Sequence, residues 1–248
     1  MKYNKEIDFN FGPDANEHYR YMLQQVFDGE YDFFPMADRH DVKLIADCGG
    51  NIGAFAVWAS NAFPDAVILS YEPDPTCCEL FEENIKAQGL EERVNLCRVA
   101  LTTRDVKETT LYLGVNNSGE NSLQQELVGP NTNSITVPTL HPDNIPAVDF
   151  MKLDIEGLEY EVLASYLKRF KPMFITFEAH GEGERVRLNQ LMWDTGYVHC
   201  GTKTIFPGIN VCGYCLDGTE LFVKSGQRYR IYQNGFVLSK SPTIKVTL

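Results

Sequence analysis

Short apolar runs alternate along the chain with longer segments in which apolar residues recur every three or four positions. The short runs are rich in Val, Ile and Phe, which is typical of buried strands, whereas the longer spacing is that of helices with one apolar side. We expect strands at VKLIA (42–46), AVILSY (66–71), RVNLCRVAL (93–101), ETTLYLG (108–114), AVDFMKLD (147–154) and PMFITFE (172–178). We expect helices at 14–27, 54–63, 75–89, 157–170 and 183–196.

The alternation of strand and helix predicts βαβ units, in which a mostly parallel sheet carries helices on both of its faces. After Tyr197 short strands predominate, including a hairpin at YQNGFV (232–237), where Asn-Gly suits a tight turn. The segment 115–134 is polar and rich in turn residues, so we expect a flexible excursion there. Sheets of this class bind ligands at the carboxyl ends of their strands, so the residues after each predicted strand are candidate site residues.

Composition and charge restrict the class of partner. The chain has 248 residues and a formal net charge of −12, and its longest basic cluster is LKRFK (167–171). Binding to nucleic acid or to an anionic membrane depends on Lys and Arg, so we expect neither partner. No apolar run reaches the ~20 residues that a membrane span needs, and the polar start MKYNKEIDFNFGPD is unlike a signal peptide. We therefore expect a soluble protein that stays in the cytoplasm.

The cysteine content favours reduced thiols over disulfides, because the seven cysteines are an odd number and are spread along the chain. One cluster has the atoms of a zinc site: His199, Cys200, Cys212 and Cys215, the last two in a C-x-x-C. Its spacing matches no regular zinc motif, and the stretch KTIFPGIN between the pairs is typical of a strand and a turn. Ordinary thiols are the favoured interpretation.

The densest group of glycines follows the first predicted strand, in DCGGNIG (47–53). Glycine is concentrated in this way where the backbone turns tightly or approaches a ligand. A dinucleotide site requires G-x-G-x-x-G, and this spacing is missing. A nucleoside without phosphates needs close backbone approach and carboxylates for its polar groups. Asp47 opens the loop, and Glu72 ends the next strand nineteen residues after Gly53. The alternative is a glycine turn and a strand-end glutamate with no ligand.

Five segments carry a resemblance to a known family: DCGGNIG, YEPDP, VALTTRD, VDFMKLDIEGLEYEVL and FITFEAH. In this order they resemble an S-adenosylmethionine-dependent methyltransferase of the FkbM type over about residues 42–197, with KLDIEGLE as the most specific part. The resemblance implies a Rossmann-like methyltransferase fold for a core at 42–197. It does not cover the two remaining regions, where we expect an N-terminal helical segment (1–41) that could cover the substrate and a β-rich extension (198–248) that completes the sheet.

The resemblance also implies the residues that bind the cofactor, S-adenosyl-L-methionine. The methionine moiety would lie on Asp47, Gly49, Gly50, Asn51 and Gly53. Glu72 would bind the ribose, the stretch at Val99-Ala100 would flank the adenine, and Asp154 would lie beside the bound cofactor. Asn51 stands where other methyltransferases have a middle glycine, and asparagine tolerates left-handed backbone better than most residues.

Methyl transfer from a sulfonium is an in-line displacement in which alignment of the reactants supplies much of the rate. A hydroxyl acceptor also needs a base. The ends of two predicted strands supply candidates, with His180 favoured and Asp154 and Glu178 beside it. The alternatives are an ordinary strand-end histidine and a structural ion pair between Asp154 and Lys152. Asp154, Glu156 and Glu178 could instead hold Mg²⁺, but we expect no metal requirement.

The sequence thus predicts an O-methyltransferase that acts on a hydroxyl of a small molecule, sugar or glycan. Three alternatives stay open: a Mg²⁺-assisted O-methyltransferase, a non-catalytic protein that binds S-adenosylmethionine, and an NAD-dependent oxidoreductase on the same sheet architecture. The missing G-x-G-x-x-G disfavours the oxidoreductase. A non-catalytic protein would leave Asp154 and His180 free to vary.

Overall fold

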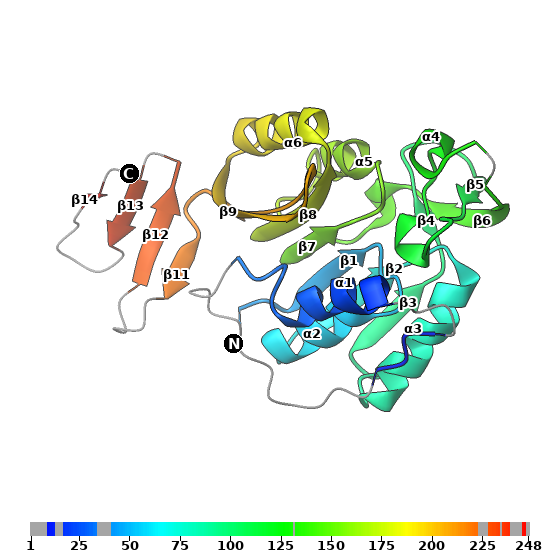
Figure 1. Ribbon diagram of the computed structural model, residues 1–248. Coiled ribbons are helices and arrows are strands. Elements are labelled where there is room, and N and C mark those ends of the chain that lie inside the picture. The colour runs from blue at the N-terminus through cyan, green and yellow to red at the C-terminus, as the bar shows by residue number, and fades with distance from the viewer. Residues whose placement is uncertain are drawn as a thin grey trace.

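A central seven-stranded sheet with helices on both faces dominates the molecule, and two smaller sheets adjoin it (Figure 1). The computed structural model describes residues 9–12, 17–33, 41–130, 132–222, 228–233, 235–238 and 245–246. The strands of the central sheet are, in chain order, β1 (Leu44–Cys48), β2 (Val67–Tyr71), β3 (Val94–Cys97), β7 (Phe150–Leu153), β8 (Phe174–His180), β9 (Tyr197–Phe206) and β10 (Ile209–Leu216).

The strand order of the central sheet is β3-β2-β1-β7-β8-β10-β9. The first five strands in this order are parallel, whereas β10 runs antiparallel to both β8 and β9. The chain therefore winds outward from β1 through β2 and β3, and then returns to the other side of β1 at β7. In such sheets the crevice between the carboxyl ends of the strands at the point of reversal is the usual ligand site. Here that point lies between β1 and β7.

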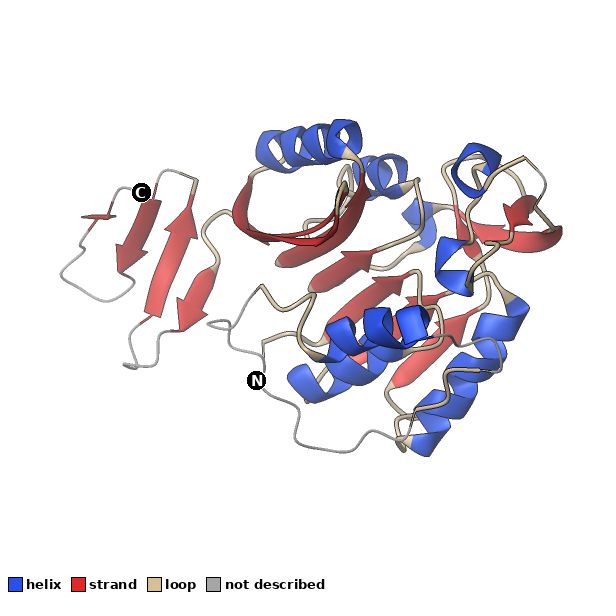
Figure 2. Cartoon of the chain, viewed as in Figure 1, coloured by secondary structure: helices blue, strands red, loops and turns tan. Residues whose placement is uncertain are grey.

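Each face of the sheet has its own apolar core, because side chains along a strand alternate between the faces. Ile45 belongs to the core under α1 (Glu17–Phe27), α2 (Ala54–Ala62) and α3 (Pro75–Ala87), whereas its neighbour Ala46 belongs to the core under α5 (Glu159–Tyr166) and α6 (Glu182–Asp194). Figure 2 shows the helices above and below the strands. The helix α2 is buried on nearly all sides because α1 packs on top of it.

The fold confirms the predicted α/β class and the predicted helices, although the first three residues of the helix expected at 14–27 lie outside the described residues. One predicted strand is divided. The amide of Val99 donates to the carbonyl of Cys97 (3.0 Å), and this turn separates β3 from β4 (Ala100–Leu101). The strand β4 then joins β5 (Glu108–Tyr112) and β6 (Ser134–Leu140) in a three-stranded sheet.

The polar segment after β5 is anchored to the turn after β7, whereas its composition predicts a flexible excursion. It contains η1 (Ser118–Glu120) and α4 (Gln125–Val128), and a further short helix, η2 (Pro142–Asn144), follows β6. The Ser122 hydroxyl donates to the carbonyl of Glu156 (2.6 Å), and the Gln124 side chain donates to the carbonyl of Gly157 (2.7 Å). Its polar side chains therefore bind backbone groups after β7 as well as solvent.

The C-terminal region is divided between two sheets. β9 begins at Tyr197, so β9 and β10 extend the central sheet past the expected core boundary. The remaining strands form a separate antiparallel sheet of β11 (Glu220–Phe222), β12 (Arg228–Tyr232), β13 (Gly235–Leu238) and β14 (Lys245–Val246). The predicted hairpin joins β12 to β13, with Tyr232 opposite Gly235; Asn234 lies outside the described residues.

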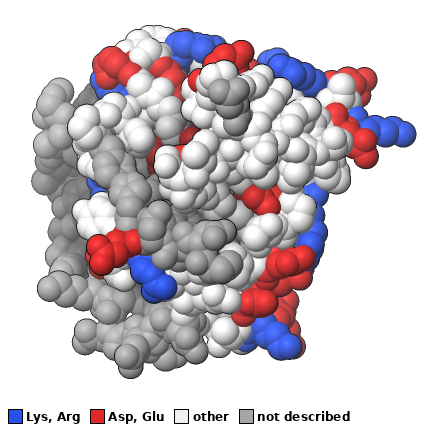
Figure 3. Space-filling model, turned by 45° about the vertical axis from the view of Figure 1, so that its right-hand side comes forward, with Lys and Arg blue, Asp and Glu red and all other residues white. Residues whose placement is uncertain are grey.

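Charged side chains are spread over the visible surface. On the face shown in Figure 3, most Lys and Arg side chains lie near the margin, and they are mixed with Asp and Glu. Basic charge is therefore not concentrated on this face. In the part of the chain that the structure describes, no helix has the length and apolar composition of a membrane span.

Candidate functional site

The carboxyl ends of the parallel strands open into a cavity of ≈ 460 Å³, a volume typical of small-molecule sites. The loops after β1, β2, β7 and the end of β8 form its walls, so it lies at the reversal point of the sheet. Further walls come from α1 and the residues after it, from the segment around η1, and from β9 and β10. The cavity is thus built by segments from most of the chain length.

The glycine loop after β1 approaches β7 too closely for side chains. Gly49 has a positive φ of 87°, and a Cβ atom there would lie 1.7 Å from the carbonyl oxygen of Asp154. Gly53, with φ 93°, turns the chain into α2, and Asn51 adopts the left-handed conformation with φ 46°. Gly49, Gly50 and Asn51 line the cavity, whereas Gly53 lies behind it. The loop therefore offers backbone to a ligand, which fits the cradle expected for the methionine moiety.

Asp47 lies beneath this loop and supports it. The side chain is fully buried, accepts a hydrogen bond from the Ser70 hydroxyl (2.9 Å) and lies 3.3 Å from Lys152 Nζ. Lys152 also donates to the carbonyl of Gly49 (2.6 Å) and lies 3.6 Å from Asp154. Burial lowers the pKa of Lys152, but Asp47 and Asp154 outweigh it and raise the pKa. The charged Lys152 joins the loop to β7, and direct binding of the cofactor by Asp47 stays a prediction.

Glu72 follows β2 and lies at the cavity wall. Its two carboxyl oxygens accept hydrogen bonds from the backbone amides of Asn51 and Asp74, each at 2.8 Å. Burial raises the pKa of Glu72 to about 7, although these two hydrogen bonds lower it. Each oxygen keeps a free lone pair, so the group can accept hydrogen bonds from two neighbouring hydroxyls. This geometry fits a ribose.

An apolar stretch adjoins Glu72. Val99, Ala100 and Leu101 line the cavity, and Ala100 is buried. Its methyl side chain leaves space for a planar ring beside the strand. Together, the glycine loop, the carboxylate and this stretch have the groups that a nucleoside such as S-adenosylmethionine requires. The structure brings the predicted cofactor residues to one cavity, except for Asp47 and Gly53, which are not part of its lining.

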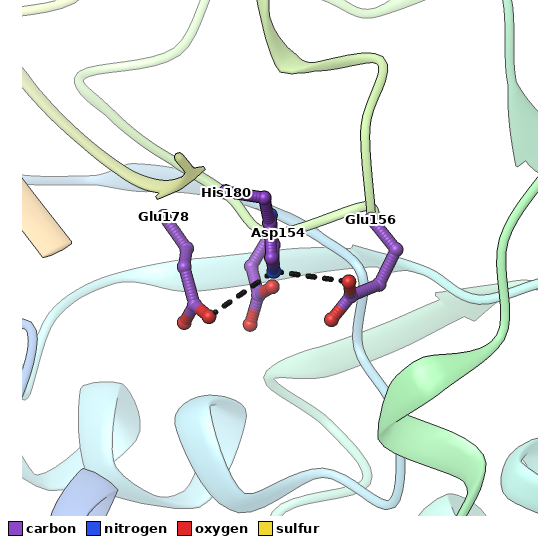
Figure 4. Close-up of side chains that lie close together, drawn as sticks. All are labelled: Asp154, Glu156, Glu178 and His180. Atoms are coloured by element: carbon purple, nitrogen blue, oxygen red, sulfur yellow. Dashed lines mark ion pairs between the residues drawn. The ribbon is translucent and has the colours of Figure 1, made fainter. Parts of the chain in front are cut away.

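A cluster of three carboxyl groups and one histidine occupies the ends of β7 and β8. Asp154 and Glu156 follow β7, and Glu178 and His180 end β8. Figure 4 shows the imidazole of His180 between the two glutamates, with Asp154 close to it. His180 Nε2 lies 3.0 Å from a carboxyl oxygen of Glu156 and 3.3 Å from one of Glu178. All four side chains line the cavity, so the predicted catalytic residues do meet.

The surroundings of His180 favour its protonated form. Burial lowers the pKa of His180, but the hydrogen bonds and charges of Glu156 and Glu178 outweigh it and raise the pKa to about 12. Nδ1 is buried and has no hydrogen-bond partner among the described residues. The ring is thus a proton donor to both glutamates, and the predicted role as general base requires its release from them. Burial also raises the pKa of Glu156 to about 7, despite the opposing effect of His180, and raises that of Glu178.

Glu159 holds the turn that positions Glu156, a role that sequence reasoning missed. Its carboxyl group is fully buried and accepts hydrogen bonds from the backbone amides of Ile155 (2.8 Å) and Gly157 (2.9 Å). Glu156, between these two residues, has a positive φ of 56°. The second glutamate of KLDIEGLE, three positions after Glu156, is the signal in the sequence that marks this turn.

Glu30 and Tyr31, after α1, were also missed. The Tyr31 hydroxyl donates to Asp154 (3.0 Å), and the backbone carbonyl of Glu30 accepts a hydrogen bond from Lys203 Nζ (2.9 Å). Both side chains are buried and line the cavity. Their partners lie 123 and 173 positions away in the sequence, so no local pattern indicates this placement.

Metal-capable groups lie at the β7–β8 ends in the described ranges. Asp154, Glu156, Glu178 and His180 have ligand atoms within 4.8 Å of one another. The cysteine cluster of the sequence analysis is not such a group: Cys200 Sγ lies 3.3 Å from Cys215 Sγ, while His199 Nε2 contacts the Thr202 hydroxyl (2.9 Å).

A Rossmann-like α/β sheet with a glycine loop, a strand-end glutamate and an apolar slot at its reversal point is the arrangement of a nucleoside-dependent methyltransferase. The chain belongs to the methyltransferase FkbM domain family, whose model matches residues 47–199. Membership of this family implies S-adenosylmethionine as the methyl donor.

Two named sequence relatives agree with this assignment. Methyltransferase 1 of Beauveria bassiana (strain ARSEF 2860) is 25% identical over 174 residues, which cover 61% of this chain and 68% of that protein. Methyltransferase sdnD of Sordaria araneosa is 23% identical over 177 residues, which cover 58% of this chain and 67% of that protein. Precorrin-6y C5,15-methyltransferase of Geobacter metallireducens GS-15 is 12% identical with a TM-score of 0.48, over 86% of this chain and 95% of that one. The names of the first two state no acceptor.

Proposed function

We propose that this protein transfers the methyl group of S-adenosylmethionine to a hydroxyl of a small molecule, sugar or glycan. One observation carries the proposal: the glycine loop and Glu72 share a cavity with the carboxyl cluster at the ends of β7 and β8. The first set fits the donor, and the second can remove a proton from an acceptor. In the reaction the bond from sulfur to the methyl carbon breaks, a carbon–oxygen bond forms, and the hydroxyl proton passes to a base.

The residues of the cavity would first align the methyl donor with the acceptor. The loop at Gly49 and Asn51 and the carboxylate of Glu72 would fix the donor, so that its methyl group faces the β7–β8 end of the cavity. Asp154 is held by the Tyr31 hydroxyl and by Lys152, and it would orient the acceptor from there. Correct placement of two reactants is worth ~7–11 kcal/mol of the barrier.

The cluster around His180 would remove the proton of the acceptor hydroxyl. Because His180 already carries a proton, we assign the acceptance of the hydroxyl proton to a carboxylate, with Glu156 as the first candidate. A pKa of about 7 suits a general base near neutral pH, and such a base contributes 10²–10⁴-fold to the rate. His180 and Glu178 then form the ion pair that keeps this carboxylate in place.

The test combines donor binding with a product screen. Calorimetry should show binding of S-adenosylmethionine and no competition by NAD. Mass spectrometry with purified protein should then detect products heavier by one CH₂ among sugars, glycosylated natural products and lipids. Tighter binding of NAD would remove the proposal, and donor binding with no product from any class would favour a non-catalytic protein.

A metal requirement is checked in the same assay. We expect turnover to persist in EDTA, because a carboxylate base suffices for the displacement. Loss of turnover that Mg²⁺ restores would instead assign Asp154, Glu156 and Glu178 to a metal site.

The net charge of −12 also supports an acceptor other than nucleic acid.

A further inference from the structure

Glu30 is a largely buried residue of the cavity lining, and its carboxyl group receives no hydrogen bond from the described residues. The residue is 8% exposed and lines the cavity at the end formed by β7 and β8. Within the described part of the chain, no side chain or amide donates a hydrogen bond to its carboxyl oxygens. A carboxyl group that faces a cavity and has no donor from the protein is available to a ligand, and such a ligand would supply the partner that a largely buried polar group needs.

The charges around Glu30 indicate the sign of that partner. Four carboxyl groups and two cations line this end of the cavity: Glu30, Asp154, Glu156, Glu178, Lys152 and His180. Lys152 is compensated below the cavity by the buried Asp47, at 3.3 Å. Lys203 lies beside the backbone of Glu30 and, like Lys152, lowers the pKa of its carboxyl group, so three cations face the four carboxyl groups and the buried Asp47. Burial raises the pKa of Glu30 to about 8, with Glu178 and Asp154 acting in the same direction. A cation from a ligand would replace the proton held there.

Apolar side chains surround the same space. Leu23 and Val26 of α1 and Ile205 and Ile209 at the ends of β9 and β10 line the cavity together with Glu30. This wall suits carbon-rich parts of a ligand, whereas a hydrated ion would gain nothing from it. All of these residues lie outside the stretch 47–199 that matches the family model. The wall therefore lies outside the part of the chain that the family model matches.

We propose that Glu30, with Glu178, binds a protonated amine on the methyl acceptor, so that the acceptor is an amino alcohol, such as an amino sugar. This inference rests on the proposed function, because it places the amine beside the hydroxyl that receives the methyl group. Glu30 is then a specificity-determining residue, and the carboxyl cluster serves both proton removal and recognition of the amine.

A divalent metal ion accounts for the cluster less well. The metal-capable group consists of Asp154, Glu156, Glu178 and His180, and it leaves Glu30 unpaired. A histidine that binds a metal usually donates its other ring nitrogen to an acceptor. His180 Nδ1 is buried without such an acceptor among the residues described. An ammonium group on the ligand accounts for the unpaired carboxyl group of Glu30, and a metal ion does not.

The experiment compares two matched probes, 6-aminohexan-1-ol and 1,6-hexanediol, in which an ammonium group and a hydroxyl occupy the same end of the chain. Titrations are made with the donor site filled by S-adenosylhomocysteine, on the wild type, on Glu30→Gln and on Asp28→Asn. Asp28 is exposed and lies two residues before Glu30, so it controls for a lost charge on the same segment. We expect the wild type and Asp28→Asn to prefer the amine by about 10-fold or more, and Glu30→Gln to lose about 10- to 100-fold of amine affinity. Affinity for the diol should not change, which shows that the variant is folded.

Several results would overturn the inference. One is a wild type that does not bind the amine, or that binds both probes equally. Another is an amine preference that survives in Glu30→Gln. If Glu30→Gln instead weakens the binding of S-adenosylhomocysteine, the cation that Glu30 recognises is the ammonium group of the donor. If Mn²⁺ displaces the amine and binds the wild type and Glu30→Gln equally well, the cluster holds a metal. Failure of the proposed function looks different: the wild type would not bind S-adenosylhomocysteine, or the methylated product would carry the new group on nitrogen.

Discussion

Replacement of Glu30 by glutamine should stabilise the protein at alkaline pH. The ordinary pKa of a glutamate is 4.5, and in the folded protein burial raises the pKa of Glu30 to about 8. Between these values the unfolded chain has released the proton and the folded protein still holds it. The free energy of unfolding therefore falls as pH rises from about 4.5 to about 8, and the lost part stays lost above that range. Glutamine has nearly the same shape and does not titrate, so this pH-dependent loss disappears.

The size of the effect follows from the two pKa values. One pH unit corresponds to about 1.4 kcal/mol, so the loss between pH 5 and pH 8 is about 3 kcal/mol. Full conversion is justified because Glu30 is only 8% exposed. Urea unfolding of wild type and Glu30→Gln at pH 5 and pH 8 measures it. The two proteins should differ little at pH 5, and the variant should be more stable by about 3 kcal/mol at pH 8.

A matched control separates burial from general charge repulsion. Asp28→Asn removes a carboxylate from the same segment, but the residue is exposed, so its pH-dependent change should stay below about 0.5 kcal/mol. If both variants gain equal stability at pH 8, the net charge of −12 is the cause. If Glu30→Gln gains none, the carboxyl group is solvated or paired in solution, and the reasoning for an amine site fails with it.

Three further predictions concern the donor site and the cluster. Glu72→Ala should weaken S-adenosylhomocysteine by about 1.5–3 kcal/mol in calorimetry, the scale of hydrogen bonds to a charged group; an unchanged affinity would remove the ribose assignment. Gly49→Ala should abolish donor binding and lower the melting temperature, because its Cβ would lie 1.7 Å from the Asp154 carbonyl oxygen. His180→Gln keeps a donor but removes the charge that lowers the pKa of Glu156, so the rising limb of the pH–rate profile should move from about 7 to about one unit higher. A rate that is lost at every pH would instead make His180 the base.

The parts of the site that lie at strand ends could be predicted from the sequence. The glycine loop, Glu72 and the residues after β7 each follow an apolar run directly, and parallel strands bring their carboxyl ends to one edge. Asp154, Glu178 and His180 therefore meet as expected. Their ionisation could not be predicted, because it depends on which carboxyl group the imidazole faces and on how deeply both are buried.

Two walls of the cavity could not be predicted from the sequence, and the physical reason is the same for both. Glu30 and Tyr31 owe their position to contacts with residues 123 to 173 positions away, and neither carries a motif. The segment after β5 has the polarity of a solvated loop. Its serine and glutamine side chains bind carbonyl groups after β7, and a hydrogen bond to backbone leaves no trace in the residue pattern. Polarity indicates a need for partners and does not indicate where they are.

The lysine that joins β9 to the segment after α1 has a consequence for synthesis on the ribosome. Lys203 Nζ donates to the carbonyls of Gly29, Glu30 and Asp32, and 174 positions separate it from Gly29. At roughly 5–20 residues per second, this lysine is made about 9–35 s after the glycine that it binds. During that interval the first part of the sheet and the donor loop can form, while the wall that carries Glu30 still lacks its anchor. A nascent chain would therefore acquire donor binding before acceptor recognition.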